Sequence, residues 1–461
     1  MKKYILLSCI AAASMSAFAQ DFDTKPAVQF ENKSEQVKFT IGGRFMADAA
    51  YYNVDEPYVA DQNIDANLHS GASIVDARIR TSMSYKDFYL YADFGFGGGK
   101  FAQKNIFAQW SHENERGNTH AVKLGYYNDP AGSMARQTSL ASYHFISRAG
   151  ASNAIGDGRA LGVSYKFRND WAFLYQGVFA EDQYNKIDAG YNGVTASARW
   201  VFRPFIMPEG YNFHLGVSGA LTQLGGGERM TTKGSSVLKK TYSLGQSMET
   251  YVDPTEKFVG GDIAWADKVL KVGGEVLFHS PKFFARGEVL YKNVYTKRDS
   301  YKIFIAQQDN VDGWGDFGLW QDANPLQDYK FKGGYVELGG ILWGDSKYKY
   351  NEADAALGGF NGRALELVGR FNITDLNNVN SGDYYSEMRD QYYPSGYMED
   401  WPYGSSSFGG GKVMSGTVGL NYSFNKYVQF MLDYTYSHLD RDKFQYAKNF
   451  HTLQGRLQFV F

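Results

Sequence analysis

The last eleven residues of the chain, numbers 451 to 461, read HTLQGRLQFVF. Apolar residues or glycine occupy the odd positions from Leu453 to Phe461, and the even positions are mostly polar. A period of two places the two sets on opposite faces, so the stretch predicts a β-strand. A closing strand that ends on an aromatic residue is typical of outer-membrane barrels, whose aromatic side chains gather at the membrane interface. The alternative is an edge strand of a soluble β-sandwich.

The same alternation recurs along the whole chain. In a sandwich the apolar set would face a core, whereas in a membrane barrel it faces lipid and the other set lines water. Sixteen segments fit, which predicts an all-β fold, a 16-stranded antiparallel transmembrane β-barrel: 37–52, 72–85, 88–96, 104–111, 120–127, 159–167, 171–180, 192–203, 211–222, 269–279, 283–293, 332–343, 363–373, 414–424, 427–438 and 451–461.

The lengths of the connections favour the barrel. Connections after even-numbered strands are mostly tight, and those after odd-numbered strands are mostly long, such as 128–158, 223–268, 294–331 and 374–413. Short periplasmic turns that alternate with long outer loops are the layout of an outer-membrane barrel. The connection 344–362 is the exception, because it is long where a short turn is expected.

The N-terminus predicts export. Lys2 and Lys3 precede an apolar run, and Ala17-Phe18-Ala19 fits an A-x-A cleavage site. We therefore expect a signal peptide at 1–19, a short periplasmic segment at 20–36 and the barrel domain at 37–461. The single cysteine, Cys9, would leave with the signal, so no disulfide or cysteine metal site is expected.

Composition restricts the class further. The chain has 51 Gly, 10 Pro and 16% aromatic residues, and no apolar run near 18 residues follows the signal, so no spanning helix is expected. The 47 Lys and Arg nearly balance the 49 Asp and Glu, which gives no reason to expect nucleic acid as a partner. No motif indicates an enzyme, a cofactor or a metal site.

Cations on the lumen-facing positions are the candidate pore residues. Rings of Arg and Lys attract anions in pores. Acids such as Asp76, Asp93, Glu275 and Glu337 share this face and would cancel part of the field. The candidates for an anion path are Arg44, Arg78, Arg80, Lys123, Arg199, Arg370 and Arg456.

The third outer loop, 128–158, combines hydroxyls and guanidiniums with apolar patches such as Phe145-Ile146. If it folds into the lumen, the patches are buried against the wall and the polar groups narrow the channel. The alternative is an outer lid that packs on a neighbouring loop. The expected constriction residues are Ser133, Arg136, Thr138, Ser139, Arg148 and Arg159.

Several stretches together resemble one family, the phosphate-selective porin O/P family of outer-membrane proteins. The resemblance is carried by Gly98-Gly99-Lys100, by the block 124–130, by Phe145-Ile146-Ser147-Arg148, by 158–163 and 364–371, and by the ending 453–459. It implies a sixteen-stranded trimeric porin whose third loop folds inward, with Arg44, Arg78 and Arg80 at arginine positions of the anion path and Ser133, Arg136, Thr138 and Ser139 in the constriction. The chain departs from the family at 128–132, where Asn-Asp-Pro-Ala-Gly lacks a cation.

We therefore expect an integral protein of the Gram-negative outer membrane that passes small hydrophilic solutes passively, with a preference for anions such as phosphate. Its partners would be the lipid bilayer with lipopolysaccharide, the solutes themselves and two further copies in a homotrimer. The alternatives are a surface-adhesion or scaffold barrel and an outer-membrane barrel hydrolase. A hydrolase is disfavoured because Ser437 and His438 are neighbours in one strand and point to opposite faces.

Overall fold

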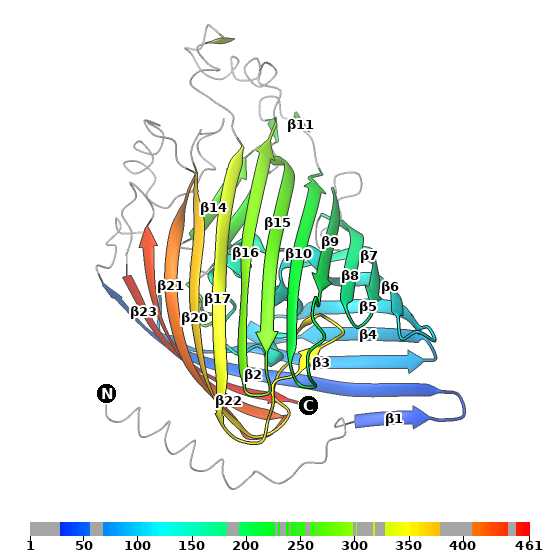
Figure 1. Ribbon diagram of the computed structural model, residues 1–461. Helices are drawn as coiled ribbons and strands as arrows, with labels where there is room; N and C mark the ends of the chain where they lie inside the picture. The colour runs from blue at the N-terminus through cyan, green and yellow to red at the C-terminus, as the bar shows by residue number, and fades with distance from the viewer. Residues whose placement is uncertain are drawn as a thin grey trace, which may run out of the picture.

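The structure is a computed structural model that describes residues 28–55, 68–181, 193–225, 229–230, 237–238, 241–246, 248–253, 259–264, 266–297, 301, 317–318, 328–378, 408–440 and 449–461. Sixteen strands form one closed antiparallel barrel (Figure 1). They are β2 (37–55), β3 (71–85), β4 (88–95), β5 (102–113), β6 (119–128), β7 (159–168), β8 (172–180), β9 (194–202), β10 (212–223), β15 (266–279), β16 (283–296), β17 (329–343), β20 (364–378), β21 (408–423), β22 (428–440) and β23 (449–460).

The barrel closes between the first and last of these strands. Strand β2 pairs with β23 from Arg44 opposite Val460 to Asp55 opposite Asn449. The backbone amide of Gly43 donates to the carbonyl of Phe461 at 2.8 Å, and the Phe461 amide donates back to Gly43 at 3.0 Å. The terminal stretch therefore completes the hydrogen bonding that an open edge would leave unpaired.

The two faces of the wall differ as the alternation predicts. Val418 and Leu453 on the outer face are 58% and 46% exposed, whereas Glu337 and Asp433 on the inner face are fully buried. A bilayer covers the first set, and the interior of the barrel receives the second. The apolar side chains of the strands are therefore mostly directed outward.

All sixteen predicted strands are confirmed, with boundaries that differ by a few residues. The largest difference is at β21, which begins at Phe408 rather than at 414. A further strand was not predicted: β1 (Val28–Asn32) forms a hairpin with the start of β2, with Val28 opposite Ile41. The expected signal peptide, 1–19, lies outside the described residues.

Short elements occupy the connections. Two-stranded hairpins pair β11 (Arg229–Met230) with β12 (Val237–Leu238), β13 (Thr241–Gln246) with β14 (Val259–Ala264), and β18 (Tyr350–Asn351) with β19 (Ala356–Leu357). Helical turns are η2 (Gly97–Gly99), η3 (Pro130–Gly132), α2 (Met134–Gln137), η4 (Leu140–Ser142) and α3 (Gly150–Ile155). Among the described residues, no helix has the length and apolarity needed to cross a membrane.

Candidate functional site

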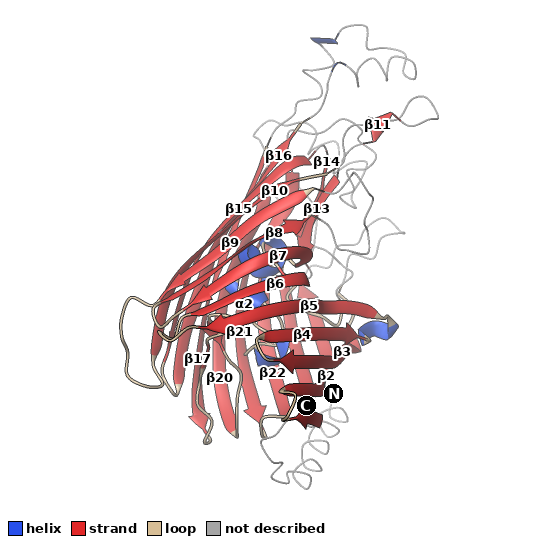
Figure 2. Ribbon diagram, turned by 90° about the vertical axis from the view of Figure 1, so that its right-hand side faces the viewer, coloured by secondary structure: helices blue, strands red, loops and turns tan. Residues whose placement is uncertain are grey.

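The third long loop, between β6 and β7, crosses the inside of the barrel, where Figure 2 shows its helices enclosed by the strands. The amide of Ile146 donates to Asp433 of β22 at 2.8 Å, and Asn421 of β21 donates to the carbonyl of His144 at 2.7 Å. These wall residues face the interior and lie far from the loop in sequence. The loop is therefore fixed against the wall opposite its own strands, and the alternative of an outer lid is wrong.

Apolar side chains hold the loop in place. Phe145 and Ile146 are fully buried, as their position in an inward loop requires. The guanidinium of Arg370 lies 4.7 Å from the centre of the Phe145 ring, and that of Arg286 lies 4.5 Å from the Tyr143 ring. Such cation–π contacts are stronger where water is excluded. The apolar patches of the third loop are thus packing surfaces.

A second outer loop, between β10 and β15, also reaches inside. Its buried Glu249 accepts hydrogen bonds from the amide of Gly150 at 2.7 Å and from Ser415 at 3.0 Å, and it pairs with Arg370 at 3.2 Å. The carboxylate of Glu249 thereby connects its own loop, between β10 and β15, to the third loop and to the barrel wall. A buried charge with this many donors is well satisfied.

The connection 344–362 enters the barrel from the side of the tight turns. Arg199 of β9 donates to the carbonyls of Asp354 and Ala355, at 2.7 and 2.8 Å. His214 of β10 lies 2.8 Å from the Tyr350 hydroxyl. Ala355, Ala356 and Leu357 are buried. The extra length that broke the pattern of short turns therefore forms a small hairpin inside the lumen.

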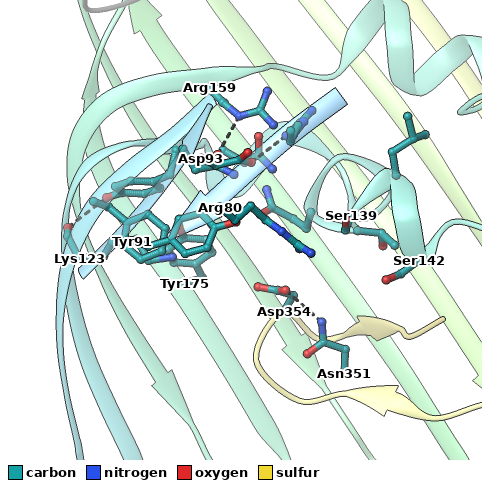
Figure 3. Close-up of a pocket in the computed structure, with 18 of the residues that line it drawn as sticks. Arg80, Tyr91, Asp93, Lys123, Ser139, Ser142, Arg159, Tyr175, Asn351 and Asp354 are labelled. Carbon is teal, nitrogen blue, oxygen red and sulfur yellow. Dashed lines mark hydrogen bonds and ion pairs between the residues drawn. The ribbon is translucent and has the colours of Figure 1, made fainter. Parts of the chain in front are cut away.

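These inserts leave a cavity of about 360 Å³ beside strands β2 to β8 (Figure 3). The third loop contributes one side and the hairpin of 344–362 another. Seven cations and two carboxylates line it, together with aromatic and hydroxyl groups. The charged lining residues are Arg44, Arg78, Arg80, Lys123, Arg148, Arg159, Lys166, Asp93 and Asp354.

Two of the arginines are neutralised by carboxylates. Arg44 donates to Asp76 from Nε at 2.9 Å. Arg78 bridges Asp76 and Asp93, at 2.7 and 2.8 Å. Lys166 is weakly paired, since its ammonium lies 3.7 Å from Asp354.

Four other cations have no carboxylate within ion-pairing distance in the described part of the chain. Arg80 donates to the carbonyls of Gly43 and Phe461, at 3.1 and 3.3 Å. Arg148 donates to two loop carbonyls, and Arg159 donates to the side chain of Asn105 at 2.7 Å. Lys123 lies over the rings of Phe107 and Tyr127. Their positive charge is therefore available to a solute in the cavity.

A comparison of the sequence with protein families matches residues 39–461 to phosphate-selective porin O and P. The chain belongs to this family. It is an integral protein of the Gram-negative outer membrane and a channel for small solutes. No curated protein matches its sequence.

Solved structures agree on the fold of this porin. It is similar to OmpT of Vibrio cholerae, with 8% identity over 94% of this chain and 100% of that one, at a TM-score of 0.50. OprB of Pseudomonas putida gives 7% identity over 92% and 94% of the two chains, also at 0.50. An anion-selective porin from Comamonas acidovorans gives 10% identity over 92% and 100%, at 0.48.

The structure separates the predicted pore residues of this porin into three groups. Arg44, Arg78, Arg80, Lys123, Thr138, Ser139, Arg148 and Arg159 all line the cavity. Arg199, Arg370 and Arg456 face inward but are sealed in ion pairs with Glu275, Glu249 and Asp48, respectively. In the third loop, Ser133 is buried against Ser152, and Arg136 donates to the carbonyls of Ser152 and Asn153.

Sequence reasoning missed several lining residues. Tyr91 shares its parity with the inward Asp93, and Phe107 shares its parity with Asn105, so the alternation contained this signal. Asp354 and Asn351 lie in the long exception 344–362, where no periodic pattern gives a direction. Within the described residues, no group of three His, Cys, Asp or Glu is placed to hold a metal ion.

Two acids of the third loop differ in ionisation. Burial acts against the charge of Asp157, but Lys271 and Lys292 outweigh it and hold the pKa of Asp157 at about 2. Burial raises the pKa of Asp129 to about 6, with Lys271 opposing the shift and Asp157 adding to it. Asp157 therefore anchors the end of the loop as an anion, whereas Asp129 gains its proton near pH 6.

Proposed function

We propose that this porin favours anions over cations. The observation that carries the proposal is the set of four cavity-lining cations that have no carboxylate partner among the described residues: Arg80, Lys123, Arg148 and Arg159. Within the described residues, the ion pairs that reduce the positive field of the cavity involve the other three lining cations. Arginine and lysine side chains that line a narrow pore attract anions and repel cations.

The inserts strengthen this effect. The third loop and the hairpin of 344–362 both line the cavity that carries the four cations and so narrow it. A solute there is within a few ångströms of the charges, which is well inside the screening length of about 8 Å at physiological salt. Phosphate and carboxylate groups are the anions that arginine binds best, because its donors form a planar fork.

The remaining expectations belong to the same proposal. Solutes would pass down their gradient without covalent chemistry. The exported chain would lose residues 1–19, keep 20–36 on the periplasmic side and span the membrane with the domain 37–461. Three copies would assemble in the bilayer; a trimer form is named for OmpT of Vibrio cholerae, one of the similar structures.

The test is the reversal potential of the purified, folded protein in a planar bilayer with a potassium chloride gradient. We expect a reversal potential with the sign that corresponds to a preference for chloride over potassium. The preference should be larger at low salt, where the cations are less screened. A potential of the opposite sign would reject the proposal. Failure to observe any conductance step would reject the open channel itself.

Matched variants locate the effect. Lys123→Gln and Arg80→Gln each remove one cavity charge that no carboxylate of the described chain compensates. Lys86→Gln removes an exposed charge from the tight turn between β3 and β4. We expect the first two to shift the reversal potential toward zero and the third to leave it unchanged. Equal shifts of the reversal potential in all three variants would mean that the selectivity does not depend on the cavity charges in particular.

A further inference from the structure

The cavity has an aromatic side as well as a cationic one. Five rings from β4, β5, β6 and β8 line it, and we call them the aromatic wall: Tyr89, Tyr91, Phe107, Tyr127 and Tyr175. Figure 3 shows Tyr91 and Tyr175 beside Lys123, across from Ser139 and Ser142 of the third loop. The lumen face of a water-filled barrel is generally polar, so five rings on it need an explanation.

The centre of the wall is a stacked pair. Tyr91 and Phe107 are direct cross-strand partners, and their ring centres lie 5.2 Å apart at an interplanar angle of 24°. Tyr89 extends the group, 6.2 Å from Tyr91. These three rings are only partly buried, whereas Tyr127 and Tyr175 are 3% and 4% exposed. The stack therefore presents ring surface to the cavity.

Cations are placed directly against this surface. The ammonium of Lys123 lies 4.3 Å from the centre of the Phe107 ring and 5.0 Å from that of Tyr127. The ammonium of Lys166 lies 4.7 Å from the Tyr175 ring. Arg80 lines the same cavity without a carboxylate partner in the described part of the chain. A flat apolar surface and a positive charge are thus available within one small space.

We propose that this cavity binds organic anions that carry a ring with an apolar face, with the anionic group at Lys123 and Arg80 and the ring on Tyr91 and Phe107. This inference rests on the proposed anion preference and adds a solute class to it. Bare inorganic anions use the cations alone, because they have no apolar face to stack. An aromatic carboxylate or a pyranose phosphate uses both sides of the cavity.

Pairs of probes matched in charge test the proposal. Chloride current through single channels is measured while benzoate or acetate, and glucose 6-phosphate or orthophosphate, is added. We expect the ring-bearing member of at least one pair to half-block the current at a concentration about three- to tenfold lower than its partner, as one aromatic contact supplies. A benzoate effect assigns aromatic carboxylates, and a glucose 6-phosphate effect assigns sugar phosphates. Equal block within both pairs would overturn the proposal.

Variants assign the effect to the wall. Tyr91→Leu and Phe107→Leu keep apolar bulk but remove the ring, so the advantage of the ring-bearing anion should fall about three- to tenfold. Block by acetate and orthophosphate should stay within about twofold. Tyr91→Phe should retain the advantage, which provides a test that does not depend on the leucine variants folding. Phe371→Leu, a ring on the outer face of β20 that is 55% exposed, is the matched control.

The outcomes separate this inference from the proposed function. A cation-selective reversal potential rejects both. An anion-selective channel that blocks equally with benzoate and acetate, and equally with glucose 6-phosphate and orthophosphate, rejects the ring site alone. Loss of the advantage in Phe371→Leu as well as in Phe107→Leu would also reject the site, because the effect would then not come from the aromatic wall.

Discussion

Arg370 of β20 donates to the carbonyl of Ser147 at 2.7 Å, which fixes the middle of the third loop to the barrel wall. The same guanidinium pairs with Glu249 at 3.2 Å and with Glu337 at 3.5 Å. All three charged side chains are almost fully buried. Arg370 was predicted as a pore charge because it is a cation at an inward position. Its charge is instead compensated, and its role is to fix the position of the third loop.

Arg370→Gln should loosen the constriction. The substitution removes the cation that pairs with buried Glu249, whereas Glu337 keeps its pair with Arg286, and breaking a buried pair in this way costs about 3–5 kcal/mol. We expect noisier single-channel currents with larger mean conductance, and a lower midpoint of thermal unfolding in detergent. Lys332→Gln is the control, because its ammonium is exposed and lies 3.9 Å from Asp375. Quiet currents of unchanged size in Arg370→Gln would contradict this role.

Arg78 and Arg80 should differ in stability but not in selectivity. Arg80 is a cavity cation without a carboxylate partner among the described residues, and loss of Arg78 would leave Asp93 at the cavity without its cation, so replacement of either arginine by Gln should weaken anion preference. Arg78 also compensates Asp76 and Asp93, and its loss should cost about 3 kcal/mol of unfolding free energy. Within the described chain Arg80 bonds to two carbonyls and to no carboxylate, so its loss should cost less than about 1.5 kcal/mol. Denaturant unfolding measures the stability of the two variants, and the reversal potential measures their selectivity. Equal stability of the two variants would contradict the prediction.

Asp354→Asn should increase anion preference. Asp354 is the carboxylate that the 344–362 hairpin brings to the cavity, beside Lys166. Removal of its charge frees that cation, and at this separation we expect about a twofold rise in the anion-to-cation permeability ratio. Glu352→Gln, in the same hairpin but paired with Arg203, is the matched control. A fall in the ratio would show that Asp354 does not face the permeating ions.

The sequence was sufficient for the strands because membrane and lumen impose a period of two on every one of them. It indicated a possible entry of the third loop because Phe145 and Ile146 are apolar and need a dry partner, but the alternative of an outer lid remained until the contacts of the loop with Asp433 and Asn421 excluded it. It could not give the pairing of charges. Arg199 and Arg80 both occupy inward positions, and only the three-dimensional register brings Glu275 to the first and no acid from the described chain to the second. Long-range contacts of this kind have no local pattern.

The same limit applies to 344–362. Its length showed that it was no simple turn, but its direction depends on the contact of Arg199 with two of its carbonyls, more than 150 residues along the chain. Tyr91 and Phe107 are a different case. Their parity predicted that both side chains face the lumen. The alternation alone does not indicate a binding role for these rings, which is suggested only by the ammonium of Lys123 over the Phe107 ring.

Asp129→Asn should remove a pH dependence from the third loop. The pKa of Asp129 is raised to about 6 by burial, so the folded protein holds this proton more tightly than the unfolded chain does. Ionisation above pH 6 therefore costs stability, and the cost decreases as pH falls below 6 until it is gone below the ordinary aspartate pKa of about 4. Asparagine resembles the protonated acid and can still accept the bond from the amide of Ala131. Asp129→Asn should unfold at a higher temperature than the wild type at pH 7.5, and the difference between the two unfolding temperatures should be much smaller at pH 4.5. Asp157→Asn is the opposite case, because its pKa of about 2 means that the charged form is the stabilising one, so this variant should be less stable than the wild type at both pH values. If Asp129→Asn instead destabilised the protein at pH 7.5, the charged form of Asp129 would be the one that the loop requires, and the assignment of Asp157 as the sole anionic anchor of the two would be wrong.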